Sequence, residues 1–164
     1  MSNETQDENE VIATVSAGSG RRFLGLGMLA FLGVLLIYIA ITNSPAFGFQ
    51  IFLVACGIGA ILLADRMRRA TGQTLELTRV ELRDTAGNTL ARMEDVTSIN
   101  RGAFDFKPSN GFLLNTRQRQ DRVWRPGLWW RFGKRVGVGG MTHRRDTKFM
   151  SEMIAVMLAE RDAD

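Results

Sequence analysis

The part of the sequence best suited to binding chemistry is a short basic and aromatic stretch, residues 122–135. Arg and Lys are interleaved there with Trp and Phe, and no acidic residue interrupts them. Guanidinium groups pair with phosphate oxygens, and Trp side chains favour the headgroup level of a bilayer. The stretch therefore predicts a surface for anionic membrane lipids or a protein partner, formed by Arg122, Trp124, Arg125, Trp129, Trp130, Arg131, Lys134 and Arg135.

A different interpretation of this stretch fits its composition equally well. The Trp side chains would fill the core of a domain, and the basic side chains would only be solvated. Basic residues among aromatic ones also suit nucleic acids. However, the chain has no RNA-binding or helix-turn-helix motif, and we expect no nucleic-acid partner. The sequence leaves open whether the stretch is surface or core.

Residues for catalysis or metal binding are scarce. His143 is the only histidine and Cys56 the only cysteine, so the chain lacks the usual ligand sets for a metal. Cys56 lies in an apolar run, where a lone thiol behaves as a small hydrophobic side chain. No Ser-His-Asp or Cys-His arrangement can be assembled. We therefore expect no catalytic, metal-binding or cofactor-binding residue, and a protein that is not an enzyme.

The longest feature is a block at residues 23–64 that contains no Lys, Arg, Asp, Glu or His. Two apolar runs fill it, residues 23–41 and 46–64, each 19 residues long. At about 1.5 Å per residue such a helix spans roughly 28 Å, close to the thickness of the hydrocarbon core of a bilayer. Residues 42–45 have the composition of a tight turn. The block predicts a transmembrane helical hairpin within residues 21–70.

The charges that flank this block predict its orientation. Arginines precede the first run and follow the second, and the connecting turn is uncharged. Because positively charged flanks stay in the cytoplasm, we expect a multi-pass protein of the cell inner membrane with both termini cytoplasmic. The acidic residues before the first run are unlike the basic start of a cleavable signal peptide. The flanking arginines are Arg21, Arg22, Arg66, Arg68 and Arg69.

Small residues recur four apart in the second apolar run, at Ala55, Cys56, Gly59 and Ala60. Such spacing lets helix backbones approach closely in lipid. These residues predict packing against the first helix. A contact between copies of the chain, or with a partner subunit, is the alternative.

The remaining sequence divides into a tail and a domain. Residues 1–20 are acidic and polar and predict a disordered tail. Residues 65–164 hold 19 of the 21 Lys and Arg and 13 of the 17 Asp and Glu, a net charge of +6. Within residues 72–164, apolar and polar residues first alternate as in an antiparallel sheet. An apolar stripe then predicts an amphipathic C-terminal helix, with Phe149, Met150, Met153, Ile154, Met157 and Leu158 on one face. This order predicts an α+β domain.

Two parts of this domain resemble known families. Residues 77–84 (LTRVELRD) and 90–99 (LARMEDVTSI), with a Gly turn between them, resemble the opening of bacterial pleckstrin-homology-like (PH-like) domains. Residues 106–112 and 124–140 are similar to uncharacterised membrane proteins of alphaproteobacteria. The resemblance covers about residues 74–160. It implies a small antiparallel β domain with a C-terminal helix beside a pair of transmembrane helices, and no catalytic residues.

Together these features predict a non-enzymatic inner-membrane protein without a cofactor. Its basic cytoplasmic domain would bind anionic lipid headgroups or a membrane partner, in an accessory or assembly role. The alternative is a small structural subunit of a larger membrane protein complex, with the basic and aromatic stretch and the small-residue face as its contact surfaces.

Overall fold

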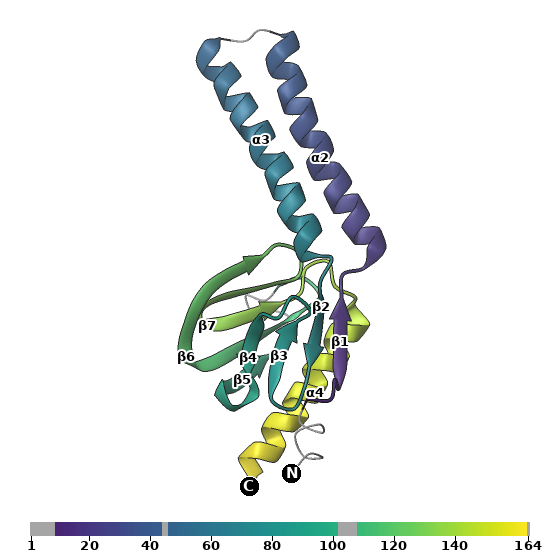
Figure 1. Cartoon of the computed structure of the whole chain (residues 1–164), viewed down its shortest axis with the longest axis vertical. Helices are drawn as coiled ribbons and strands as arrows, with labels where there is room; N and C mark the ends of the chain where they lie inside the picture. Colours follow the sequence, from purple (N-terminus) through teal and green to yellow (C-terminus); the bar gives the residue numbers. More distant parts are fainter. Residues whose placement is uncertain (1–8, 44–45, 102–107, 164) are drawn as a thin grey trace. The chain divides into compact units, whose positions relative to one another are not determined.

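The computed structural model describes residues 9–43, 46–101 and 108–163, and it has the α+β architecture expected from the sequence (Figure 1). The chain forms two units. One unit, Ser19–Arg69, is a pair of helices. The other unit joins the chain before Ser19 to the chain from Ala70 onward, and it contains the strands and the last helix.

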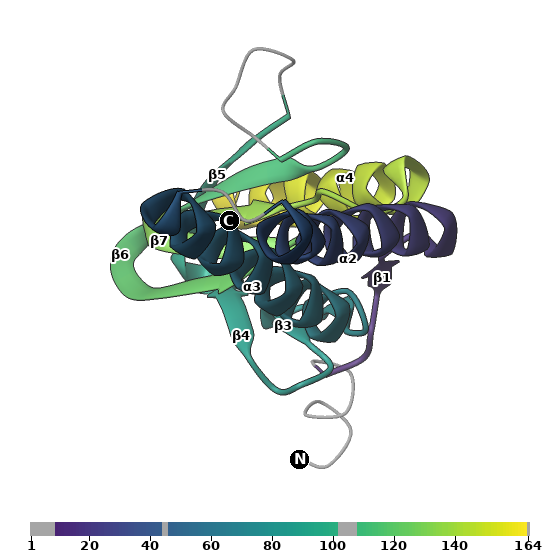
Figure 2. The ribbon, with the colours of Figure 1, turned by 90° about the horizontal axis from the view of Figure 1, so that it is seen from above.

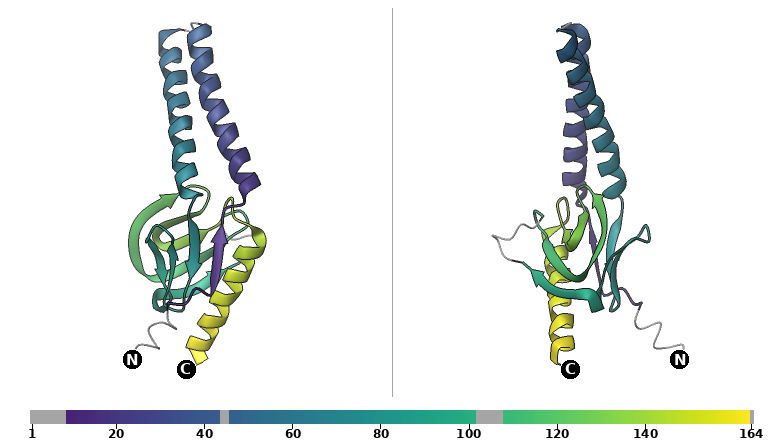
Figure 3. Two further views of the ribbon diagram at one scale, coloured as in Figure 1. Left: turned by 45° about the vertical axis from the view of Figure 1, so that its right-hand side comes forward. Right: turned by 90° about the vertical axis from the view of Figure 1, so that its left-hand side faces the viewer.

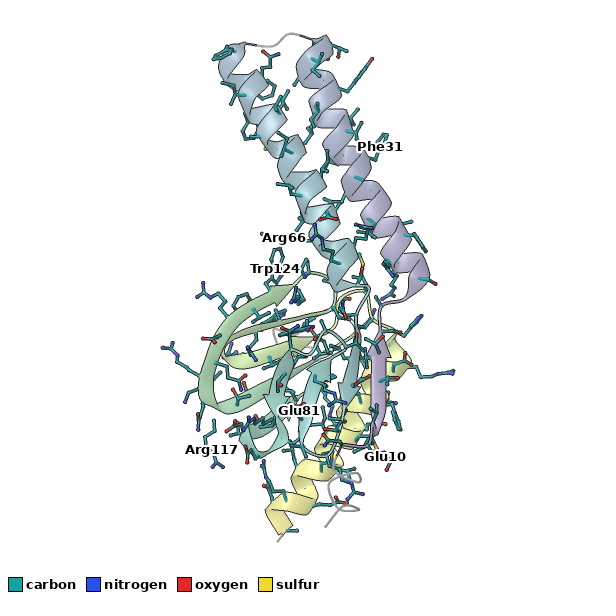
Figure 4. The ribbon with its side chains drawn as sticks, in the orientation of Figure 1. Glu10, Phe31, Arg66, Glu81, Arg117 and Trp124 are labelled. Carbon is teal, nitrogen blue, oxygen red and sulfur yellow. The ribbon has the colours of Figure 1, made fainter. Side chains whose placement is uncertain are left out.

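The helical unit consists of α2 (Ser19–Thr42) and α3 (Phe47–Ala70), each 24 residues long, which run side by side (Figures 1 and 2). Both helices are longer than the apolar runs because the helical backbone continues through the flanking arginines. Only 11% and 17% of their most apolar windows are buried, and Phe31 on α2 is one of many side chains that face outward (Figure 4). Both helices are therefore long and apolar enough to cross a membrane. Residues 44 and 45 of the expected turn lie outside the described residues.

The two helices approach each other closely at a pair of glycines. A Cβ atom at Gly33 would lie 2.8 Å from the carbonyl oxygen of Gly57 and 2.7 Å from the side chain of Ile61. A Cβ atom at Gly57 would lie 2.8 Å from the carbonyl oxygen of Gly33 and 2.7 Å from the side chain of Ile37. Each glycine thus makes room for an isoleucine of the other helix.

Polar contacts join the helices on either side of this crossing. Gln50, the polar residue that interrupts the second apolar run, donates from Nε2 to the carbonyl oxygen of Ala40 at 3.0 Å. Near the opposite end, Arg22 donates from Nη2 to the carbonyl oxygen of Arg68 at 3.4 Å. The first of these bonds gives a partner to Gln50, the one polar side chain within the apolar run of residues 46–64.

Three of the four residues expected to pack between the helices do not do so. Ala55, Cys56 and Gly59 are exposed, and nothing lies within 4 Å of a Cβ placed on Gly59. Ala60 is half-buried. For Ala55, Cys56 and Gly59 the prediction of packing against the first helix is wrong, because the contact runs through Gly57 on the neighbouring side of α3. The alternative, a contact with another chain, is left open.

The first sheet of the other unit has four antiparallel strands in chain order. The alternation expected from the sequence is confirmed. Leu75, Leu77 and Leu82 are fully buried, and their neighbours in β2 and β3 are partly solvated, with the exception of the buried Asp84. The strands are β1 (Ala13–Ser16), β2 (Thr74–Leu77), β3 (Glu81–Asp84) and β4 (Thr89–Arg92).

The presence of β1 corrects the prediction of a disordered tail at residues 1–20. Residues 1–8 lie outside the described residues, but β1 pairs with β2 from Ala13↔Leu77 to Ser16↔Thr74. Ala13 and Val15 are buried in the core. Four residues with two apolar side chains are too short a pattern to stand out in a polar segment. The chain thus passes from β1 through both helices into β2, and residues 72–164 alone lack an edge strand.

The second sheet has three antiparallel strands, and the last helix packs beside the first sheet. The expected amphipathic helix is confirmed as α4 (Arg144–Ala163), which lies along β1 (Figures 1 and 3). Its buried stripe of Met150, Ile154 and Leu158 completes one core with both sheets, whereas Phe149 is exposed. The strands are β5 (Val96–Asn100), β6 (Phe112–Arg125) and β7 (Trp129–Val138), and η1 (Met93–Asp95) is a short 3₁₀ helix before β5.

Candidate functional site

The basic and aromatic stretch forms the end of β6, a tight turn and most of β7. The turn uses Pro126 and Gly127, the latter with φ +84°, and Leu128 donates its N–H to the carbonyl oxygen of Arg125 at 3.2 Å. These are the features of a type II turn, in which Pro fixes one φ and Gly supplies the positive one. Successive side chains in the paired strands point to opposite faces, so the turn decides which residues share a face.

Three of the expected contact residues lie on the face toward the core. Trp129 is 1% exposed and belongs to the core, where its Nε1–H has no hydrogen-bond partner among the described residues. Arg125 pairs with Trp129 across the hairpin and is half-buried. The third is Arg131, which pairs with the partly buried Val123.

Arg131 is a structural tie between the two sheets. Its Nη1 donates to the carbonyl oxygen of Thr89 on β4 at 2.7 Å and to the side chain of Gln120 on β6 at 3.0 Å. Its Nε donates to the carbonyl oxygen of Asp121 at 2.9 Å, and Nη1 also approaches the carbonyl oxygen of Leu90 at 3.4 Å. A guanidinium group with these partners is committed to the fold, so Arg131 does not fit its expected role as a lipid or partner contact.

The opposite face carries a cluster that we call the Arg/Trp patch: Arg122, Trp124, Trp130 and Phe132. Trp124 and Trp130 are paired across the hairpin, and Trp130 stacks on Phe132 with ring centroids 5.2 Å apart. The guanidinium carbon of Arg122 lies 5.5 Å from the centroid of the Phe132 ring, a cation–π contact. Trp124 is 52% and Phe132 41% exposed. Large aromatic side chains are thus presented to the surroundings together with a cation.

Further cations lie along the same hairpin. Lys134 and Arg135 on β7 and Arg117 and Arg119 on β6 are exposed, and within the described part of the chain none of the four forms an ion pair. Residues 112–138 contain seven basic side chains and one acid, a net charge of +6 against +4 for the whole chain. Arg117 and Trp124 lie toward opposite ends of β6 (Figure 4), so the positive charge extends along the hairpin.

Hydrogen bonds connect the turn of this hairpin to the point where the chain leaves the domain for α2. Met141 donates its N–H to the carbonyl oxygen of Gly127 at 2.9 Å. Gly18, the last residue before α2, donates its N–H to the carbonyl oxygen of Met141 at 2.8 Å. The turn, the segment before α4 and the end of the β1 segment therefore lie side by side, with Trp124 two residues before the turn proline.

Both interpretations of the stretch thus apply, each to one face. The structure brings Trp124 and Trp130 together on the outer face, where Arg122 joins them, and places Trp129 and Arg131 on the inner one. Phe132 was missing from the expected contact residues. The signal for it was its position two residues after Trp130, which places both on one face of a strand.

The described residues contain no group of three or more His, Cys, Asp or Glu side chains that could hold a metal ion. Compared with protein-family models, with curated proteins and with solved structures, the chain shows no match. The chemistry of the site therefore has to be argued from its own side chains, which offer cations and aromatic surface.

Proposed function

We propose that this chain is a non-enzymatic protein of a bacterial inner membrane, with an accessory or assembly role, whose basic cytoplasmic domain binds anionic lipid headgroups. The observation that carries the proposal is the Arg/Trp patch, which faces away from the core at the end of the domain where the chain enters α2. Trp side chains partition to the headgroup level, and each basic residue near an anionic surface contributes about 1 kcal/mol.

Membrane anchoring is supported by what α2 and α3 expose. Their outward side chains are almost all apolar, including Phe23, Phe31 and Phe52, which are between 57% and 72% exposed. Soluble proteins rarely expose contiguous apolar surface of more than a few hundred Å². A bilayer would cover this surface, and the length of both helices suits that environment.

The pairing of β1 with β2 supports a hairpin with both flanks on one side of the membrane. The segments before α2 and after α3 belong to one sheet, so a single crossing would separate strands that pair with each other. The flanking arginines favour the cytoplasm for that side. Protease added to intact spheroplasts should leave the domain uncut, and digestion of the domain would contradict this orientation.

The order of elements also supports a PH-like domain. Two antiparallel sheets followed by a closing C-terminal helix form the arrangement that the resemblance of residues 74–160 implies. In chain order, the pair of helices lies between β1 and β2 of this domain. The resemblance carries no site residues, so the lipid contact rests on the Arg/Trp patch alone.

The test uses the tryptophans themselves, because all three lie in this hairpin. The full chain is reconstituted into nanodiscs with phospholipids brominated near the headgroup, either neutral or mixed with phosphatidylglycerol. We expect bromine to quench Trp emission more strongly in the anionic discs. Trp124→Phe should remove a large part of the quenchable emission and leave the part from half-buried Trp130, whereas buried Trp129 should supply the unquenched part.

Charge reversal tests whether cations hold the patch at the lipid. The double change Lys134→Glu and Arg135→Glu should lower quenching in anionic discs and leave it unchanged in neutral ones. Arg131 is kept because it ties the sheets together. Arg79→Glu with Arg92→Glu is the matched control, since both residues are exposed outside the hairpin. Equal quenching of wild type and the Lys134/Arg135 variant in anionic discs would contradict the role of these two cations, and quenching of wild type that is no stronger in anionic than in neutral discs would contradict binding to anionic headgroups.

A second candidate function is a small subunit of a larger membrane complex. It is favoured by the exposed small residues Ala55, Cys56 and Gly59 on α3, which leave room for another helix. Purification in mild detergent distinguishes the two candidate functions. Partner proteins that co-purify in stoichiometric amounts would favour a subunit of a complex, and a lone monomer would count against it.

A further inference from the structure

A basic groove lies along the first turns of α4, on residues that the Arg/Trp patch does not share. Its volume is about 360 Å³, and the side chains of Arg144, Thr147, Lys148 and Ser151 line it from the helix. Arg101, which follows β5, lines it from another part of the chain. Cations from two separate elements therefore converge on one hollow.

The helical side of the groove carries more cations than acids. Among the described residues, α4 lines it with two cations, Arg144 and Lys148, and one acid, Glu152. Glu152 approaches Lys148 at 3.8 Å, and both side chains are more than half exposed, so water screens the pair. The Arg144 side chain makes no hydrogen bond or ion pair with any residue that the structure describes. The helical side of the groove thus keeps an excess of positive charge.

The floor of the groove is fixed by hydroxyl groups that are already engaged. Thr147 donates from Oγ1 to the carbonyl oxygen of Asn110 at 2.7 Å, which ties the helix to the start of β6. Ser151 donates from Oγ to the carbonyl oxygen of Lys148 at 2.7 Å. Both residues are at most 4% exposed. A ligand would therefore meet a rigid polar floor and would be held by the cations at the rim.

We infer that this groove binds a phosphate group. Arg144 and Lys148 are four residues apart on α4, so their side chains rise from the same face of the helix and can approach one anion from neighbouring positions. Guanidinium offers a planar pair of donors to phosphate oxygens, and the lysine adds a point charge. The described residues that line the groove are charged, polar or Gly, a lining that suits an anion. This site does not rest on the lipid contact proposed above.

Two sources of phosphate suit the groove. Arg144 is three residues beyond Met141, whose carbonyl oxygen accepts the N–H of Gly18 at the exit to α2. The phosphate of a lipid headgroup is therefore one source, and a soluble phosphate compound is the other. The chemistry of recognition is the same for both.

The test is a titration of the full chain in neutral detergent with inorganic phosphate at constant ionic strength, with chloride as the reference. We expect saturable binding by calorimetry. Arg144→Gln and Lys148→Gln should each weaken it roughly tenfold, as loss of one charge-assisted contact does. Arg145→Gln is the matched control: it removes the same charge from the next residue of α4, which is exposed and does not line the groove.

The proposed phosphate site is ruled out if phosphate gives no saturable binding. It is also ruled out if Arg145→Gln weakens binding as much as Arg144→Gln, since the general positive charge of the helix would then explain the binding. Unchanged thermal unfolding of the variants without phosphate shows that they are folded. Nanodiscs separate the two sources. If phosphatidic acid in the disc suppresses phosphate binding compared with phosphatidylcholine alone, the lipid headgroup is the source. If it does not, the groove takes a soluble phosphate compound.

Discussion

The helices α2 and α3 contact each other at glycines, which have no side chain. The strands β6 and β7, in contrast, place successive side chains on two different faces. In the first, Gly33 and Gly57 let two backbones approach, and apolar side chains cover most of both helices between the flanking arginines. In the second, Trp129 enters the core while its neighbour Trp130 and the paired Trp124 lie on the other face. One hairpin is nearly uniform around its surface, and the other has two different sides.

This difference determines where a single substitution acts. In β6 and β7, a residue that points into the core contributes to the stability of the domain. The next residue along the strand points outward and is available for contacts with other molecules. In α2 and α3, the outward positions of the apolar runs carry similar side chains, and we expect the positions where the helices touch to be the sensitive ones. Matched pairs of substitutions within each hairpin therefore test the comparison directly.

The largest expected effect separates two tryptophans. Trp129→Ala should lower the free energy of unfolding by about 3–5 kcal/mol, because it leaves a large cavity in the core. Trp124→Ala should cost under about 1 kcal/mol, since that side chain is half exposed. Urea denaturation of the full chain in detergent, followed by far-ultraviolet circular dichroism, measures both. Similar losses in the two variants would contradict the division of the hairpin into two faces.

A smaller effect separates two arginines. Arg131→Met should cost about 2–3 kcal/mol, because it leaves carbonyl oxygens of β4 and β6 without their charged donor. Arg135→Met should change stability by no more than about 0.5 kcal/mol, since Arg135 is exposed. The same denaturation experiment compares them. If Arg135→Met destabilises the domain as much as Arg131→Met, charge rather than the specific hydrogen bonds holds the sheets together.

The sequence contains the information for some of these features and lacks it for others. Alternating apolar residues predict β2 and β3, and the stripe through Met150, Ile154 and Leu158 predicts α4, because burial on one side leaves a periodic pattern. The same stretch cannot show that Arg131 bonds to Thr89, since those residues are distant in sequence and come together only in the folded domain.

The helical hairpin and β1 show two other limits. Hydropathy predicts that residues 23–64 form two helices that suit a bilayer, but apolar side chains all round give no contrast between the face that packs and the face that meets lipid. Small residues at Ala55 and Gly59 were therefore as plausible a contact as Gly57. For β1, four residues with two apolar side chains do not predict a strand by themselves. They form one by pairing with β2, which lies beyond both helices in the sequence.

The smallest expected effect tests the crossing point of α2 and α3. Gly57→Val should destabilise the helical hairpin by about 1–3 kcal/mol, because its side chain would meet the backbone of Gly33. Gly59→Val, two residues away, meets nothing within 4 Å and should leave the pairing of the helices unchanged. Unfolding of the full chain by a rising mole fraction of sodium dodecyl sulfate, followed by helical circular dichroism, compares the two. If Gly59→Val alone alters the assembly of the protein in mild detergent, the exposed face of α3 is a contact with another chain. If both valines destabilise the hairpin equally, the crossing does not run through Gly57.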